Sequence, residues 1–162
     1  MKRIWAPWRM AYVSNAEPSD GCIFCRAWEC DDDRQRLVLV RSRSTMVMMN
    51  RYPYTGGHLM VAPVRHVPDM DGLGDEELLD LMHCLRKSHA LLNRAVHPDG
   101  CNVGINYGKA AGAGIDDHLH IHIVPRWNGD TNFMTVTGGV RVIPQALMDA
   151  YDHLAAAIKT GW

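Results

Sequence analysis

The feature that most constrains the fold is residues 118–124, where His118, His120 and His122 alternate with Leu or Ile. Successive side chains of an extended chain point to opposite faces, so the three histidines share one face and the aliphatic residues share the other. The aliphatic row belongs in a hydrophobic core, which predicts a strand of a sheet with one covered face. Folding alone does not require three imidazoles on the opposite face, and we therefore expect chemistry there.

The spacing of these histidines limits what they can do together. Residues two apart along a strand are separated by about 6.6 Å, and the outer pair by about 13 Å. One metal ion cannot be bound by all three rings, because zinc to nitrogen distances are about 2 Å. At least one ring should therefore be free for another task.

Turn signals and hydrophobic periodicity divide the rest of the chain into short strands and two helices. Strands are expected at 37–41, 45–49, 58–62 and 102–106, with a loop of small residues at 108–114 and the histidine strand at 118–124, which Pro125 ends. A long central helix begins at the acidic residues 75–77 and has one apolar face with Leu78, Met82, Leu85 and Leu92, and a C-terminal helix spans 145–158. This order predicts an α+β fold, a largely antiparallel sheet of about five strands in one domain over 1–162, with 1–20 as an N-terminal arm.

Charge and hydropathy exclude several classes of protein. The 162 residues carry a formal net charge of −1 with no local basic patch, which argues against nucleic acid as a partner. Apolar stretches are far shorter than the roughly 20 residues of a membrane helix, and nothing resembles a signal peptide. We therefore expect a cytoplasmic protein with no membrane partner.

Cys22 and Cys25 form a Cys-x-x-Cys pair, the spacing found in structural zinc sites. In a reducing compartment such a pair indicates metal binding or redox chemistry before a structural disulfide. A redox pair would normally follow a strand of a βαβ unit, which the sequence does not predict.

The seven residues from His118 to Val124 fill every position of the signature His-φ-His-φ-His-φ-φ, where φ is hydrophobic, and the chain therefore resembles the histidine triad (HIT) family. Residues 50–53 and 57–61 are similar to that family's nucleoside-side strand and turn, so the resemblance covers residues 22–126. Residues 5–9 and 125–133 resemble the bacterial branch that includes diadenosine tetraphosphate phosphorylases. The resemblance implies a HIT-like fold and a homodimer whose sheets join.

The resemblance also implies roles for individual residues. The middle histidine, His120, would be the nucleophile, and His122 would serve a non-bridging oxygen or the leaving group. The substrate would be bound by Asn50 at the ribose, by Asn106 at a phosphate, by His58 through a supporting hydrogen bond, and by backbone N–H groups around Gly112 and Gly114. A structural zinc ion would be held by Cys22, Cys25, His66 and His118, and no organic cofactor is expected.

The expected function is attack on the α-phosphate of a nucleotide, with dinucleoside polyphosphates as the leading substrates and phosphorolysis or hydrolysis as the outcome. Three alternatives stay open: a hydrolase of nucleoside phosphoramidates that releases AMP, a nucleotide-binding protein of low turnover, and a metal-dependent hydrolase with His118 and His120 as ligands. Formation of a covalent nucleotidyl adduct would separate an enzyme with His120 as nucleophile, which forms the adduct, from a metal-dependent hydrolase, which does not.

Overall fold

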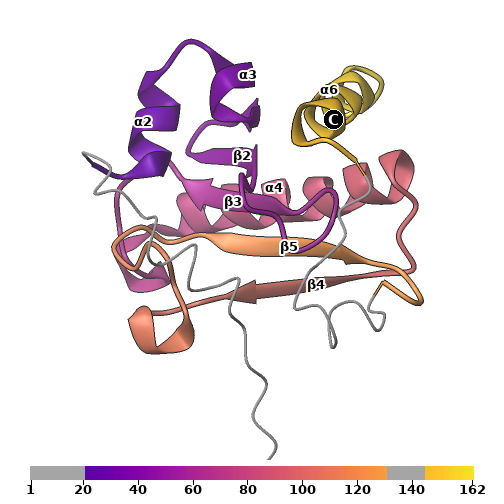
Figure 1. Cartoon of the computed structure of the whole chain (residues 1–162). Coiled ribbons are helices and arrows are strands. Elements are labelled where there is room, and N and C mark those ends of the chain that lie inside the picture. The colour runs from indigo at the N-terminus through magenta and orange to yellow at the C-terminus, as the bar shows by residue number, and fades with distance from the viewer. Residues whose placement is uncertain (1–20, 131–144) are drawn as a thin grey trace, which may run out of the picture.

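The computed structural model describes residues 21–130 and 145–162, so the expected arm at 1–20 lies outside the described residues. It contains one five-stranded antiparallel sheet in the order β1-β2-β3-β5-β4, with helices on both faces (Figure 1). The strands are β1 (Val38–Arg41), β2 (Thr45–Met49), β3 (Leu59–Pro63), β4 (Gly100–Ile105) and β5 (Ile121–Arg126). The α+β class and the antiparallel sheet are confirmed.

The histidine strand differs from its expected bounds at both ends. β5 begins at Ile121, and the preceding residues are held outside the ladder by a bond from the Leu119 N–H to the Val67 carbonyl. Pro125 lies inside β5, opposite Cys101, and does not end it. The pairing of β3 with β5 reaches only Ile123, so the missing N–H of Pro125 costs no bond to β3.

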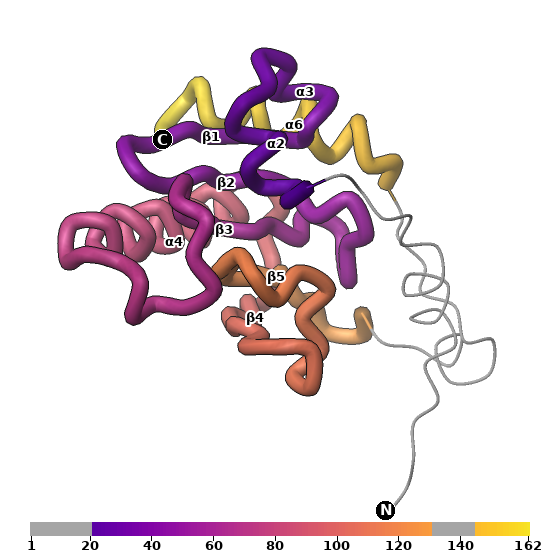
Figure 2. The backbone as a smooth tube through the Cα atoms, turned by 90° about the vertical axis from the view of Figure 1, so that its left-hand side faces the viewer, coloured from indigo at the N-terminus to yellow at the C-terminus, as the bar shows by residue number. Residues whose placement is uncertain are grey.

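The aliphatic row of this segment is buried as expected, in the larger of two hydrophobic clusters. That cluster lies between the sheet and two helices, α4 (Asp75–Ala95) and α6 (Leu147–Lys159), which Figure 2 shows from the side. Met82 is 50% exposed, so its expected place on the buried face was wrong. The buried face of α4 is centred one residue earlier, because it includes the small residues Cys84 and Ser88 that a count of large apolar residues leaves out: Leu81, Cys84, Ser88, Leu91 and Leu92.

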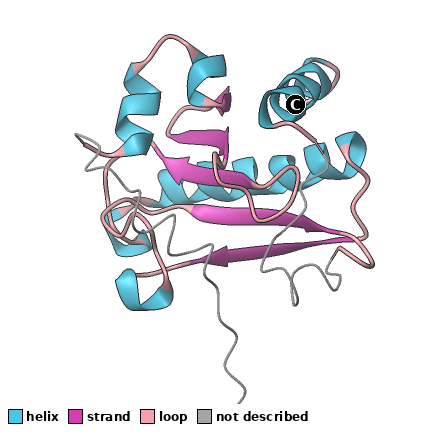
Figure 3. Ribbon diagram, in the orientation of Figure 1, coloured by secondary structure: helices cyan, strands magenta, loops and turns pink. Residues whose placement is uncertain are grey.

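The opposite face of the sheet carries a smaller cluster beneath α2 (Ile23–Glu29). Phe24 and Ala27 of α2 pack there against three methionines, one valine and one alanine of β1, β2 and β3. A second short helix, α3 (Asp33–Arg36), follows, and the Asp32 carboxylate accepts a bond from the Gln35 N–H at its start. The short 3-10 turns η1 (Met70–Gly72) and η2 (Lys109–Ala111) complete the described elements, which Figure 3 colours by type.

No helix in the described part of the chain has both the length and the apolar character to cross a bilayer.

Candidate functional site

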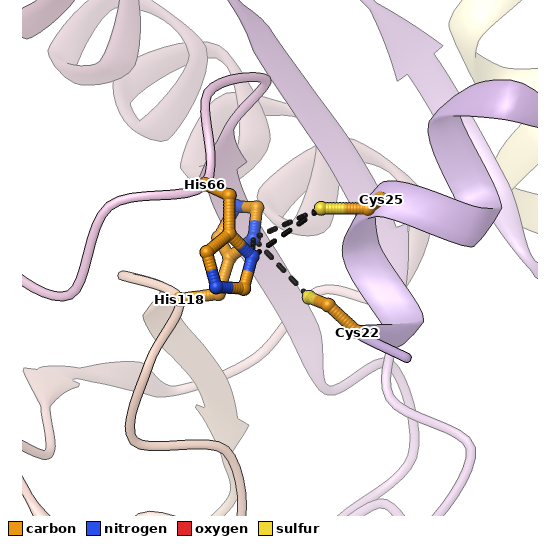
Figure 4. Close-up of side chains that lie close together, drawn as sticks. All are labelled: Cys22, Cys25, His66 and His118. Carbon is orange, nitrogen blue, oxygen red and sulfur yellow. Dashed lines mark hydrogen bonds between the residues drawn. The ribbon is translucent and has the colours of Figure 1, made fainter. Parts of the chain in front are cut away.

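Four of the expected residues meet at one end of the sheet. Cys22 precedes α2 and Cys25 lies in its first turn, while His66 follows β3 and His118 precedes β5 (Figure 4). Their donor atoms all lie within 4.8 Å of one another. The Nδ1 atom of His118 is 3.2 Å from the Cys22 Sγ, 3.7 Å from the Cys25 Sγ and 3.3 Å from the His66 Nδ1. The Cys25 Sγ is 3.4 Å from the His66 Nδ1.

These distances fit a tetrahedral metal ion. Zinc bonds of about 2.3 Å to sulfur and 2.0 Å to nitrogen give tetrahedral edges of about 3.3–3.8 Å. The two histidines are also oriented as ligands usually are, through their second ring nitrogens. The Nε2 of His118 donates to the Pro63 carbonyl at 2.8 Å, which leaves the Nδ1 lone pair facing the sulfurs, and the Nε2 of His66 lies 3.5 Å from the Asp117 carboxylate.

His120 is oriented the other way round. Its Nδ1 donates to the carbonyl of His118 at 2.9 Å, so the lone pair of the neutral ring is on Nε2. The ring packs 5.0 Å from the ring of Phe24 and 4.8 Å from that of His122, measured between centroids. Only 6% of the residue is exposed, and this burial lowers the pKa of His120. A neutral imidazole with a free lone pair is a competent nucleophile near pH 7.

A chain of hydrogen bonds sets the tautomer of His122. The backbone N–H of Tyr54 donates to the Nδ1 of His58 at 3.2 Å, so the proton of His58 is on Nε2. That Nε2 donates to the Nδ1 of His122 at 3.0 Å, and the neutral ring of His122 therefore carries its proton on Nε2. His122 is thus prepared to donate a proton or a hydrogen bond.

The rings of His58 and His122 are both kept neutral. Burial, reinforced by repulsion from the neighbouring histidines His122 and His120, lowers the pKa of His58 to about 3. Burial and the proximity of His120 lower the pKa of His122 to about 4. Neither ring therefore carries a charge near pH 7.

The other expected substrate residues lie directly after β2 and β4 or in the loop between β4 and β5. Asn50 directly follows β2, its N–H donates to the His58 carbonyl at 2.9 Å, and its Oδ1 accepts the N–H of Tyr52 at 2.9 Å, a local turn contact. Asn106 directly follows β4, whose last residue Ile105 pairs with Ile121. The loop that contains Gly112 and Gly114 therefore joins the sheet beside His120, and Gly112 adopts a left-handed conformation (φ +91°) that favours glycine.

Sequence reasoning did not identify the groups that position the histidines. Phe24 contacts the rings of His118 and His120, and the Tyr54 ring lies 4.6 Å from that of His58. The carbonyl of Pro63 and the carboxylate of Asp117 orient the two histidines of the cluster of Cys22, Cys25, His66 and His118, which we call the Cys/His group. Phe24 lies inside the Cys-x-x-Cys pair, the only signal in the sequence that connects one of these groups to the site.

Comparison with known proteins matches the HIT domain to residues 33–129. A Mycobacterium tuberculosis protein named AP-4-A phosphorylase is 39% identical, and the match covers 96% of this chain and 83% of the relative. Adenosine 5'-monophosphoramidase hnt1 of Schizosaccharomyces pombe is 25% identical over 85% of this chain and 98% of its own.

Solved structures share the fold. A Zn-bound histidine triad family protein from Mycobacterium smegmatis superposes with a TM-score of 0.69 at 27% identity, covering 86% of this chain and 94% of that one. The hypothetical histidine triad nucleotide-binding protein ST2152 from Sulfolobus tokodaii superposes with a TM-score of 0.67 at 23% identity, covering 86% and 93% of the two chains.

Proposed function

Because this chain belongs to the HIT domain family, we propose that it is an enzyme that cleaves nucleotides at the α-phosphate, with His120 as the nucleophile and dinucleoside polyphosphates as the substrates. The observation that carries the proposal is the hydrogen bond from His120 Nδ1 to the His118 carbonyl, since it leaves the Nε2 lone pair available for attack. The similarity to a protein named AP-4-A phosphorylase supports the substrate class.

In the first step, the Nε2 of His120 attacks the α-phosphorus. A P–N bond forms, the P–O bond to the remaining polyphosphate breaks, and a nucleotidyl-histidine results. The proton on Nε2 of His122 stabilises a phosphate oxygen or passes to the leaving group. Neutral rings suit both roles, and burial keeps them neutral.

In the second step, an acceptor oxygen attacks the same phosphorus and His120 leaves as a neutral imidazole. Water as acceptor gives up a proton, which returns to the Nε2 of His122, and releases a nucleoside monophosphate. Inorganic phosphate as acceptor releases a nucleoside diphosphate. Because the reaction is divided into two displacements, His120 and His122 serve in both steps.

The substrate is bound mainly by groups beside His120 and His122. We assign the ribose to Asn50, whose Nδ2 remains for the sugar while Oδ1 holds the turn. Asn106 and the backbone of the loop at Gly112 and Gly114 serve the phosphates, because small residues let N–H groups approach closely. His58 acts through His122 rather than on the substrate.

We assign zinc to Cys22, Cys25, His66 and His118, where it supplies a structural cross-link. Four protein ligands leave no position for a substrate or a reactive water. The Cys/His group contains His118 and not His120, which disfavours a metal-dependent hydrolase with both rings as ligands. A Zn-bound relative supports the choice of metal.

We propose a second copy of this chain as the partner at β4. Among the described residues, β4 pairs only with β5, so its other edge is available, and Val103 on it is 52% exposed. Pairing of two such edges would join the sheets of two protomers. Sedimentation of the purified protein tests this: a dimer is expected, and a monomer at micromolar concentration would refute it.

Product analysis tests the proposed reaction. The protein is incubated with diadenosine tetraphosphate, with and without inorganic phosphate, and the nucleotides are separated. ADP and ATP formed only with phosphate would identify a phosphorylase, whereas AMP and ATP without phosphate would identify a hydrolase. No cleavage of the dinucleotide, with rapid cleavage of adenosine 5'-monophosphoramidate, would refute the substrate class and favour the activity named for the yeast relative.

A further inference from the structure

We infer that Arg41 is a positioning residue for the metal site: from β1 it fixes the far end of α2 so that Cys22 and Cys25 meet the two histidines. The inference rests on the proposed metal site. Arg41 contributes no ligand atom, and its side chain acts on the backbone of the helix that carries the thiols.

The guanidinium of Arg41 binds the last carbonyls of α2. Its Nη1 donates to the Trp28 carbonyl at 2.6 Å, and its Nη2 donates to the carbonyls of Ala27 and Cys30 at 2.9 and 2.7 Å. The last carbonyls of a helix have no intrahelical partner, and a cation there also interacts favourably with the helix dipole. Three carbonyls on one fork fix the direction of the helix as well as its end.

Arg41 is itself held firmly. Its Nε and Nη2 donate to one carboxylate oxygen of Asp33 at 2.9 and 2.7 Å, and its guanidinium lies 5.1 Å from the centre of the Trp28 ring. Its backbone belongs to β1, where it pairs with Met46 of β2. Arg41 therefore fixes the position of α2 relative to the sheet, and the segment with His118 leads directly into β5 of the same sheet.

The helix needs such an anchor because it is short. α2 has 7 residues, and isolated helices below about 12 residues are marginal in water. Cys22 at its N-cap makes no side-chain capping bond, so the end with the thiols is not held locally. Phe24 and Ala27 anchor the helix by packing, which resists rotation less strongly than directed bonds. Without Arg41, metal binding would have to order the helix, and that cost would weaken affinity.

The substitution Arg41→Lys tests the inference, because lysine keeps the charge but cannot form the five bonds of the fork. Zinc affinity, measured by competition with a chelating dye, should fall about tenfold, the smaller end of the usual effect of groups behind metal ligands. Arg34→Lys is the matched control, since Arg34 makes a two-bond fork with Asp152 that does not involve α2. Its zinc affinity should equal that of the wild type.

A second variant and a metal-free measurement complete the test. Asp33→Asn weakens the support of Arg41 and should lower zinc affinity in the same direction, by less. In the metal-free protein, hydrogen exchange at the amides of α2 should be faster in both variants than in Arg34→Lys.

Wild-type zinc affinity in both Arg41→Lys and Asp33→Asn would overturn the inference, even if their free energy of unfolding were lower. A wild-type protein that binds no zinc would instead refute the proposed metal site, and the inference with it.

Discussion

His118 and His120 lie two residues apart, yet the structure gives them opposite tautomers. His118 donates from Nε2 to the Pro63 carbonyl and presents Nδ1 to two cysteines and a histidine. His120 donates from Nδ1 to the His118 carbonyl and keeps its lone pair on Nε2. In both rings, the carbonyl that accepts from one nitrogen decides what the other nitrogen can do.

The two regions are also coupled through one residue. His118 contributes its ring to the Cys/His group, and its carbonyl accepts a hydrogen bond from the ring of His120. Phe24 adds a second link, because it packs on both rings from the helix that carries the cysteines. Disturbing the metal region should therefore affect catalysis through geometry, whereas disturbing the catalytic region should leave the metal in place.

The largest expected effect is that of His120→Asn. Loss of the nucleophile should lower kcat on the order of 10⁴-fold or more, in line with removal of nucleophiles from other enzymes. Zinc content, measured on the purified protein by elemental analysis, should stay at the wild-type level because His120 is not in the Cys/His group. Loss of zinc together with activity would break the division between the two regions.

His122→Asn should lower kcat by about 10²–10⁴-fold, the usual contribution of a general acid. The effect should shrink for a nucleotide ester with a leaving group of low pKa, because such a group needs no proton. Steady-state rates for two such substrates check this. An equal loss for both would show that His122 only supports the ring of His120.

Removal of the metal should have a smaller effect on rate and a clear effect on stability. Cys22→Ser should lower activity about tenfold, as for other disturbances around a metal. At a free zinc concentration about 100 times the dissociation constant, the wild type should gain about 2.7 kcal/mol of unfolding free energy that the variant lacks. Immediate and complete loss of activity on chelation, with no change in thermal unfolding, would contradict a structural role.

A further expected effect is a pH dependence of stability. The pKa values of His58 and His122 are about 3 and about 4 in the folded chain, below the ordinary 6.5. Between the folded-state pKa values and 6.5, the unfolded chain binds more protons than the folded chain. The stability from the two neutral rings is therefore fully present above pH 6.5 and is lost as the pH falls through about 4 and about 3. Each histidine contributes at most about 1.4 kcal/mol per pH unit.

Denaturant unfolding at pH 7, 6 and 5 measures this slope. His58→Gln should flatten it, because the most strongly shifted histidine is then gone. An unchanged slope in that variant would place the titrating group elsewhere.

Much of this site follows from the sequence because it depends on local geometry. The period of two in a strand predicted that the aliphatic residues at 119, 121 and 123 are buried opposite the histidines, although the strand begins only at Ile121. The large separation of alternate residues along an extended chain predicted that one metal cannot bind all three rings, and of the three only His118 joins the Cys/His group.

The remainder depends on contacts between distant segments. The Pro63 carbonyl that orients His118 lies 55 residues away, and no local pattern reveals it. The short helix α2 buries only Phe24 and Ala27, too few residues for a visible periodicity, so the sequence predicted a Cys-x-x-Cys pair but not its helix. Met82 was wrongly placed in the core because burial on α4 is shared with Cys84 and Ser88.

Trapping of the covalent adduct tests whether His120 is a metal-free nucleophile. The zinc-loaded protein is mixed with α-labelled diadenosine tetraphosphate, quenched within milliseconds in alkali to preserve a P–N bond, and mapped by mass spectrometry. We expect an adenylyl group on His120, present in Arg34→Lys and absent in His120→Asn. Turnover of the dinucleotide without any protein-bound nucleotide, or label on another residue, would contradict it.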